Sequence, residues 1–255
     1  ILAYRRLFEE ENATIITTFD ALMDRLVRPE VLRGFLLRLK AEDTLDLEKL
    51  RQHLVGMGYE SAYQVDAPGQ FAVRGGIVDI FALTEELPYR IELWGDEIDS
   101  IRTFDPDSQR SVDTLDEIVV YPAAELVLTK AQQEAGLKQI TAEGKRLSEQ
   151  YRKEMKTEEA HRLEQAVELL QEQVEEFGSV RAAESYLTYF YQDTVSFLEF
   201  ASRCAARRDQ KLLIFADEPA RCLEKAAAVE KEFSDSMQQR LEKGYILPGQ
   251  MDVLY

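Results

Sequence analysis

The chain has 255 residues, of which 45% are hydrophobic and 31% are charged. It can therefore bury one large core or two smaller ones, and global disorder is excluded. Its 31 Lys and Arg residues against 48 Asp and Glu residues give a formal net charge of -17 at pH 7, which argues against a free-standing DNA-binding module because such a chain repels a phosphate backbone.

The positions of the cysteines, histidines and apolar residues exclude further classes of protein. Cys204, Cys222, His53 and His161 lie far apart, so neither a disulfide framework nor a zinc site of ordinary ligand spacing is predicted. No stretch approaches the roughly 18 continuous apolar residues of a membrane span, and the first residues do not have a signal-peptide pattern. We expect a soluble, cytoplasmic protein without a cofactor, a bound metal or a membrane partner.

The first part of the chain predicts a fragment of an α/β sheet. Residues 13–18 form a β-branched run that is typical of a strand, and residues 20–26 place apolar side chains at helical spacing. A helix is predicted over residues 35–56, with Asp43 or Thr44 as its cap.

The character of the chain then changes between residues 59 and 122. Short alternating runs are separated by Pro and Gly turns, which is typical of an antiparallel sheet in a compact β-rich domain. The runs cover residues 63–66, 71–74, 77–81, 89–95 and 98–104.

After Pro122 the sequence is helical for almost the whole remainder. Residues 126–155 and 157–177 predict two charge-rich helices, the second closed by Gly178. Residues 211–218 read as a buried parallel strand ending in two carboxylates, and this strand could pair beside residues 13–18. The first and last thirds of the chain would then form one discontinuous α/β domain, with the β-rich domain inserted between them.

Asp217 and Glu218, at the end of that strand, are the residues to test for catalysis. P-loop ATPases hold Mg²⁺ with carboxylates at such a strand end. However, no Gly-x-x-x-x-Gly-Lys-Ser/Thr motif occurs to cradle a triphosphate, so we favour a non-catalytic strand end over a magnesium position. Helix packing or surface exposure is favoured for His53 and His161. No catalytic, cofactor-binding or metal-ligating residue is predicted.

The informative feature of the sequence is the run Tyr89-Arg-Ile-Glu-Leu-Trp94. Strict alternation sends Tyr89, Ile91 and Leu93 to the core and places Arg90, Glu92 and Trp94 on the other face. Arg74, in the run that begins at Phe71, can point to that same face. Arginine beside tryptophan is typical of a protein–protein contact, because both bury large areas while keeping a polar end. A tryptophan stacked under its own arginine or covered by a local helix is the structural alternative.

Several stretches resemble the UvrB-homology region of bacterial transcription-repair coupling factors. The resemblance is strong across the β-rich domain, at residues 58–59, 69–81, 88–111 and 121–123. It is looser in the flanks, at residues 18–30, 159–163, 178–186, 212–218 and 244–248, where the sequence is similar to the first helicase-like domain of UvrB.

The resemblance implies a fold and a function. It implies a degenerate RecA-like (P-loop NTPase-like) α/β domain, incomplete in this chain and formed by residues 1–34 and 122–255, that is interrupted by a UvrA-binding β-rich domain at residues 35–121. Arg74, Arg90 and Trp94 would contact UvrA. RNA polymerase and double-stranded DNA would bind regions of the full protein that are not in these residues.

On this interpretation the chain recruits UvrA to stalled transcription and performs no catalysis by itself. The alternative is a fragment of a UvrB-like ATP-dependent DNA helicase with Asp217 and Glu218 on Mg²⁺. The Asp-Glu-Pro-Ala sequence at residues 217–220, where UvrB has Asp-Glu-Ser-His, favours the coupling factor.

Overall fold

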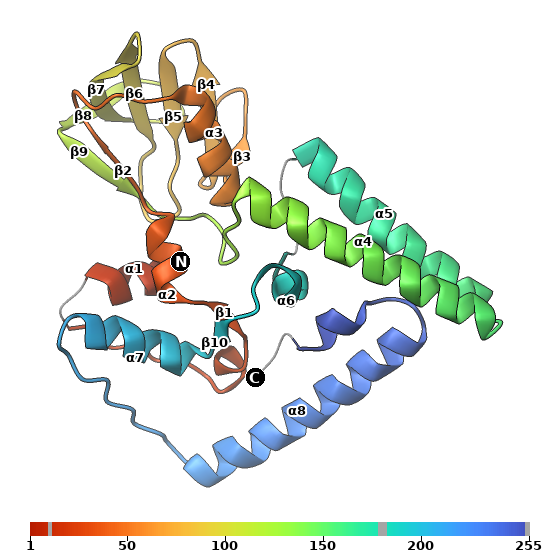
Figure 1. Cartoon of the computed structure of the whole chain (residues 1–255). Coiled ribbons are helices and arrows are strands. Elements are labelled where there is room, and N and C mark those ends of the chain that lie inside the picture. The colour runs from red at the N-terminus through yellow and green to blue at the C-terminus, as the bar shows by residue number, and fades with distance from the viewer. Residues whose placement is uncertain (10–11, 178–182, 253–255) are drawn as a thin grey trace. The chain divides into compact units, whose positions relative to one another are not determined.

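The computed structural model describes residues 1–9, 12–177 and 183–252 (Figure 1). It is a mixed α/β structure, and the chain divides into two compact units. The β-rich unit comprises residues 1–10 and 30–130, and the helical unit comprises residues 11–29 and 131–255.

A six-stranded sheet dominates the β-rich unit, in the order β3-β4-β5-β6-β7-β8. All neighbours are antiparallel except β3 and β4. Gly75 and Gly95 have positive φ angles of 59° and 64° at the turns that join β4 to β5 and β6 to β7, as tight hairpins require. The antiparallel sheet predicted from the alternating runs is confirmed. The strands are β3 (Glu60–Ser61), β4 (Gln70–Arg74), β5 (Ile77–Ile80), β6 (Tyr89–Trp94), β7 (Glu97–Phe104) and β8 (Ser111–Leu115).

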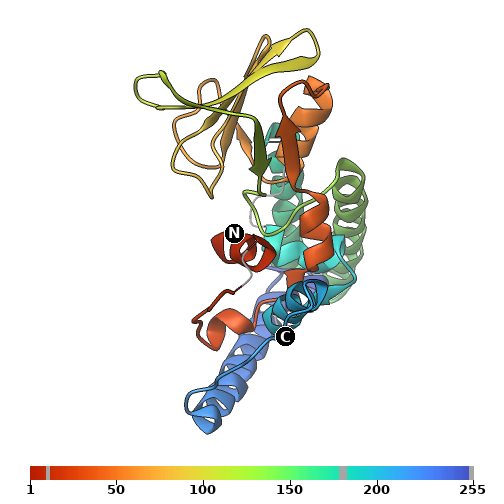
Figure 2. The same ribbon diagram turned by 90° about the vertical axis from the view of Figure 1, so that its left-hand side faces the viewer.

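A second, two-stranded sheet and three helices complete this unit. The remaining elements are α1 (Leu2–Glu9), α2 (Pro29–Gly34), β2 (Leu37–Lys40), α3 (Leu47–Gly56) and β9 (Glu117–Val120). Although β2 and β9 are distant in sequence, they pair antiparallel and lie side by side in both views (Figure 1, Figure 2). The core combines sheet residues with residues of α3, among them Phe71, Ile91, Ile101, Leu50 and Leu54, each at most 3% exposed.

The helix predicted over residues 35–56 is wrong in its first half. Residues 37–40 are strand β2, because their backbone groups pair with β9, about 80 residues later in the chain, and local spacing does not reveal such a partner. The cap of α3 is Asp46 instead of Asp43 or Thr44: its carboxylate accepts hydrogen bonds from the backbone N–H groups of Glu48 and Lys49, both at 3.1 Å.

Two long helices form the main feature of the helical unit. The two predicted helices, α4 (Lys130–Lys153) and α5 (Thr157–Phe177), run as an antiparallel hairpin (Figure 1). The first begins at Lys130 instead of at residue 126. The Gln171 amide donates to the Thr141 hydroxyl at 2.9 Å, and Arg152 pairs with Glu164 at 2.7 Å. Gly178, the predicted cap, lies outside the described residues. The remaining elements are η1 (Asp20–Leu22), β1 (Leu26–Val27), η2 (Ala183–Tyr186), α6 (Leu187–Phe190), β10 (Thr194–Val195), α7 (Phe197–Arg207), α8 (Pro219–Glu242) and η3 (Pro248–Asp252).

The strands predicted at residues 13–18 and 211–218 are wrong. Neither run forms a strand, and the second is exposed along its whole length, with Phe215 92% exposed. The helix predicted over residues 20–26 is only the short turn η1. Within the described part of the helical unit, the only sheet is the two-residue pair β1-β10. An apolar β-branched run becomes a strand only where other strands accept its hydrogen bonds.

Candidate functional site

Strand β6 presents two chemically different faces, and this prediction is confirmed. Tyr89 and Ile91 are 7% and 0% exposed, whereas Trp94 is 85% exposed. Leu93 is only partly buried, and it lies where the register with β7 shifts, between Glu92 and Leu93. The indole therefore projects from the end of β6 into solvent.

The two predicted arginines converge on one buried carboxylate. Asp79 of β5 lies directly opposite Arg90 and is 0% exposed. Arg90 donates from Nε to Oδ1 and from Nη2 to Oδ2 of Asp79, both at 2.8 Å, and Arg74 donates from Nη2 to Oδ2 at 2.6 Å. Alternation therefore correctly placed Arg74 and Arg90 on one face of the sheet. The hydrogen bond from Arg90 to Asp79 raises the pKa of the Arg90 guanidinium.

Further contacts hold Arg90 in a single orientation. Its Nη2 also donates to Oε1 of Gln109 at 2.9 Å, and its guanidinium carbon lies 4.2 Å from the centroid of the Phe104 ring. Gln109 has a positive φ of 59° in the loop between β7 and β8, which is uncommon for a residue other than glycine. The Arg90 side chain is consequently only 15% exposed, compared with 35% for Arg74.

A second ion pair extends the same face across β6 and β7. Glu92 accepts hydrogen bonds from Nη2 of Arg102 at 2.9 Å and from the Ser100 hydroxyl at 3.0 Å. Three guanidiniums, from Arg74, Arg90 and Arg102, thus stand with two carboxylates, from Asp79 and Glu92, which leaves one unbalanced positive charge. We call these five residues together with Trp94 the arginine–tryptophan face.

Sequence reasoning missed Asp79, Arg102 and Gln109. Asp79 interrupts the apolar run 77–81, and this polar residue was the only available signal. Its role follows from strand register, because the partner of Asp79 is known only once β5 is aligned with β6. Gln109 contacts Arg90 from the loop between β7 and β8, and alternation of side chains does not predict the path of a loop.

The other residues singled out from the sequence lie on helices or at the start of one. Asp217 and Glu218 are exposed at the start of α8, where Glu218 pairs with Arg221 at 2.9 Å. His53 stacks on Phe35 with 5.5 Å between ring centroids, and its Nε2 lies 2.9 Å from the Phe35 carbonyl oxygen, as a helix-packing role predicts. His161 is exposed on α5. Within residues 1–9, 12–177 and 183–252, no group of three or more His, Cys, Asp or Glu residues could hold a metal, and no helix is long and apolar enough to cross a membrane.

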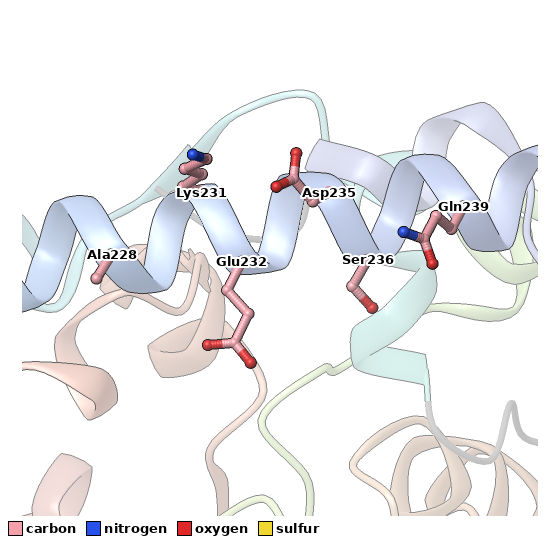
Figure 3. Close-up of a pocket in the computed structure, with 6 residues that line it drawn as sticks. All are labelled: Ala228, Lys231, Glu232, Asp235, Ser236 and Gln239. Atoms are coloured by element: carbon pink, nitrogen blue, oxygen red, sulfur yellow. The ribbon is translucent and has the colours of Figure 1, made fainter.

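The helical unit has a hollow of about 500 Å³ along α8. Figure 3 shows its lining residues, which all come from this one helix: Ala228, Lys231, Glu232, Asp235, Ser236 and Gln239. Their side chains leave the helix in different directions and do not converge on a common point. A ligand site requires polar groups that converge on the ligand, so this hollow is a weaker candidate than the arginine–tryptophan face.

Known proteins have sequences similar to the part of the chain that contains this face. Residues 37–126 match the family model described as the UvrB interaction domain. The chain is 32% identical, over 95% of its length, to a transcription-repair-coupling factor of Bacillus subtilis, and 37% identical over 121 residues to that of Escherichia coli. It is also 35% identical over 152 residues to the UvrABC system protein B of Thermosipho africanus.

The chain spans a small part of these relatives, namely 20%, 10% and 23% of their lengths. All strands of the six-stranded sheet, and with them the arginine–tryptophan face, lie inside the matched residues 37–126. The resemblance noted in the sequence is thereby confirmed. Residues 37–126 are similar to the UvrB interaction domain, and the chain is similar along almost its whole length to a segment of the transcription-repair-coupling factors.

Proposed function

We propose that the chain is a UvrA-recruiting region that couples stalled RNA polymerase to nucleotide excision repair. The observation that carries this proposal is the exposure of Trp94 beside a cluster of guanidiniums, on a sheet that belongs to a UvrB interaction domain. Similarity to a transcription-repair-coupling factor and to a UvrABC system protein B supports the coupling role and the repair system.

The arginine–tryptophan face has the chemistry of a protein contact. An indole that is 85% exposed has a large apolar area to bury, and the neighbouring guanidiniums can donate charge-assisted hydrogen bonds to carboxylates of a partner. Alternation places Arg74, Arg90 and Trp94 on the same side of the sheet. Binding of UvrA would therefore bury the indole and neutralise the remaining positive charge.

Calorimetric titration of the chain with UvrA tests this function. Arg90→Ala and Trp94→Ala are each expected to weaken binding by about 2 kcal/mol or more, as truncation of a central interface residue does. Phe215→Ala is the matched control, because Phe215 is an exposed aromatic residue of the helical unit, and this variant should bind like the wild type. Unchanged affinity in both face variants would remove these residues from the site.

For the flanking segments, residues 1–34 and 122–255, we propose two parts of a degenerate RecA-like domain without catalytic activity. Similarity to the coupling factor over 95% of the chain supports this assignment. RNA polymerase and double-stranded DNA would bind the full-length protein elsewhere. The purified chain should show no ATP hydrolysis above background.

The second candidate function is a fragment of a UvrB-like ATP-dependent helicase. It is favoured by the similarity to UvrABC system protein B. This function requires Mg²⁺ on Asp217 and Glu218, two exposed residues that follow an unpaired segment. ATP hydrolysis that disappears in Asp217→Ala would support the helicase and contradict the non-catalytic assignment.

A further inference from the structure

Asp79 is a carboxylate that no partner molecule can reach. It is 0% exposed, and it accepts three hydrogen bonds from the two guanidiniums of Arg74 and Arg90. A buried carboxylate is stable only where it is paired and hydrogen-bonded, and here both of its oxygens are bonded. Asp79 therefore does not contact a partner directly, and the arginines that it holds connect it to the surface of the face.

Asp79 occupies the donors of the two arginines to different extents. Arg90 commits Nε and Nη2 to Asp79, packs over Phe104 and is 15% exposed. Arg74 commits Nη2 to Asp79 and is 35% exposed. Because a guanidinium has five N–H donors in a fixed fork, Arg74 keeps donors for a partner while Asp79 fixes the direction in which they point.

The net charge of the cluster indicates which chemical group of a partner it can bind. Two guanidiniums on one carboxylate leave a single positive charge, and the nearby pair of Glu92 and Arg102 is neutral as a unit. One carboxylate of the partner would complete the balance. A flexible side chain that is immobilised on binding loses rotamer entropy, so donors that are already held in place bind more tightly.

From this geometry we infer that Asp79 is the positioning residue of the arginine–tryptophan face, and that it pre-orients Arg74 and Arg90 to receive one carboxylate of the partner. This inference rests on the proposed function and specifies the recognition chemistry of the same face. It predicts a change in binding affinity opposite to the change that simple charge attraction predicts. Removing the Asp79 charge makes the cluster more positive, yet binding should become weaker.

The experiment is titration of UvrA with Asp79→Asn. The amide preserves the shape of the side chain but places an N–H₂ group against guanidinium donors, so the arginines lose their common anchor. We expect roughly tenfold weaker binding or more. Asp113→Asn, the same substitution at an exposed aspartate of β8, is the matched control and should bind like the wild type.

A double-mutant cycle separates positioning from a general loss of structure. In a chain that already carries Arg74→Ala and Arg90→Ala, adding Asp79→Asn should not weaken binding further if Asp79 acts through these arginines. An additional tenfold loss in that background would mean that Asp79 merely supports the sheet, and would overturn the inference.

A spectroscopic measurement on the wild-type chain keeps the inference falsifiable even if Asp79→Asn fails to fold. In NMR spectra of the arginine side chains, the Nε–H proton of Arg90 should exchange with water at least tenfold more slowly than that of Arg110, whose side chain is exposed. Equal exchange rates would show that Asp79 does not hold Arg90, and the inference would be wrong.

The failure of this inference is distinguishable from the failure of the proposed function. If the wild type binds UvrA and Arg90→Ala does not, while Asp79→Asn binds as tightly as the wild type or more tightly, then the function stands and the positioning role is refuted. If the wild type itself does not bind UvrA, the proposed function is refuted and the role of Asp79 in binding is refuted with it.

Discussion

Two runs of this chain have the sequence character of a strand, and they differ completely in the structure. Residues 89–94 form β6, which pairs with β5 on one side and with β7 on the other. Residues 211–217 are richer in consecutive apolar residues, yet they form no strand, and Leu213, Ile214 and Phe215 are 73%, 61% and 92% exposed.

The difference between the two runs lies in their hydrogen-bonding partners. Residues 89–94 lie between two strands that are close in sequence: two residues connect β6 to β7 and eight connect β5 to β6. Residues 211–217 would need a distant strand, and residues 13–18, the partner expected from the sequence, are themselves unpaired. An apolar run thus indicates the capacity to be a strand, whereas the pairing depends on the rest of the fold.

Amide hydrogen exchange is the most sensitive test of this comparison. The amides of Ile91 and its paired neighbours should exchange only on substantial unfolding, whereas those of residues 211–217 should exchange almost as in a free peptide. We expect rates that differ by roughly a thousandfold or more. Comparable protection in the two runs would mean that residues 211–217 are paired in solution, and the contrast between the two runs would be wrong.

Two matched substitutions compare how much a buried and an exposed phenylalanine contribute to the free energy of unfolding. Phe71 on β4 is 0% exposed and Phe215 is 92% exposed. Phe71→Ala should lower the free energy of unfolding by about 3–5 kcal/mol because it leaves a cavity in the core, whereas Phe215→Ala should change it by no more than about 0.5 kcal/mol. Urea denaturation measures both, and a large loss in Phe215→Ala would show that the run packs against the rest of the chain.

The two faces of β6 should also differ in their contribution to stability. Ile91 is 0% exposed, so Ile91→Ala should destabilise the β-rich unit by about 2–5 kcal/mol. Trp94→Ala should leave its stability within about 0.5 kcal/mol while weakening the binding of UvrA. If Trp94→Ala instead lowered the unfolding midpoint as much as Ile91→Ala, the indole would be part of the core and the face would lose its proposed role.

Low pH should cause a small loss of stability in the β-rich unit, through Glu9. Burial favours the neutral form of Glu9, but hydrogen bonds from the Tyr121 hydroxyl and the Arg5 guanidinium outweigh it and lower the pKa of Glu9 below its ordinary value of 4.5. A lowered pKa in the folded state stabilises the fold above pH 4.5, and this stabilisation is lost as the pH falls through the folded value.

The docking of α1 on the β-rich unit should accordingly weaken below about pH 4.5. Glu9→Gln should flatten the decline of the urea midpoint between pH 5 and pH 3, since this variant has no carboxylate to protonate. Tyr121→Phe removes one donor and should move the decline to higher pH. An unchanged profile in both variants would show that this contact contributes nothing to the acid sensitivity.

Elements whose partners are close along the chain could be predicted from the residues alone. The hairpin strands between residues 70 and 104, the α4–α5 helix pair and the outward position of Trp94 all follow from short-range periodicity and turn residues. The same alternation placed Arg74 and Arg90 on one face. Such features depend on side-chain spacing and local backbone conformation, which neighbouring residues specify.

The folded chain was needed to find the features that depend on distant partners, because the fold itself brings those partners together. It made residues 37–40 a strand against β9, left residues 211–217 without a partner, and enclosed Asp79 between two guanidiniums. Backbone hydrogen bonds between strands and buried ion pairs form between groups whose proximity depends on register and topology. Local periodicity specifies which way a side chain points, and the fold specifies what it meets.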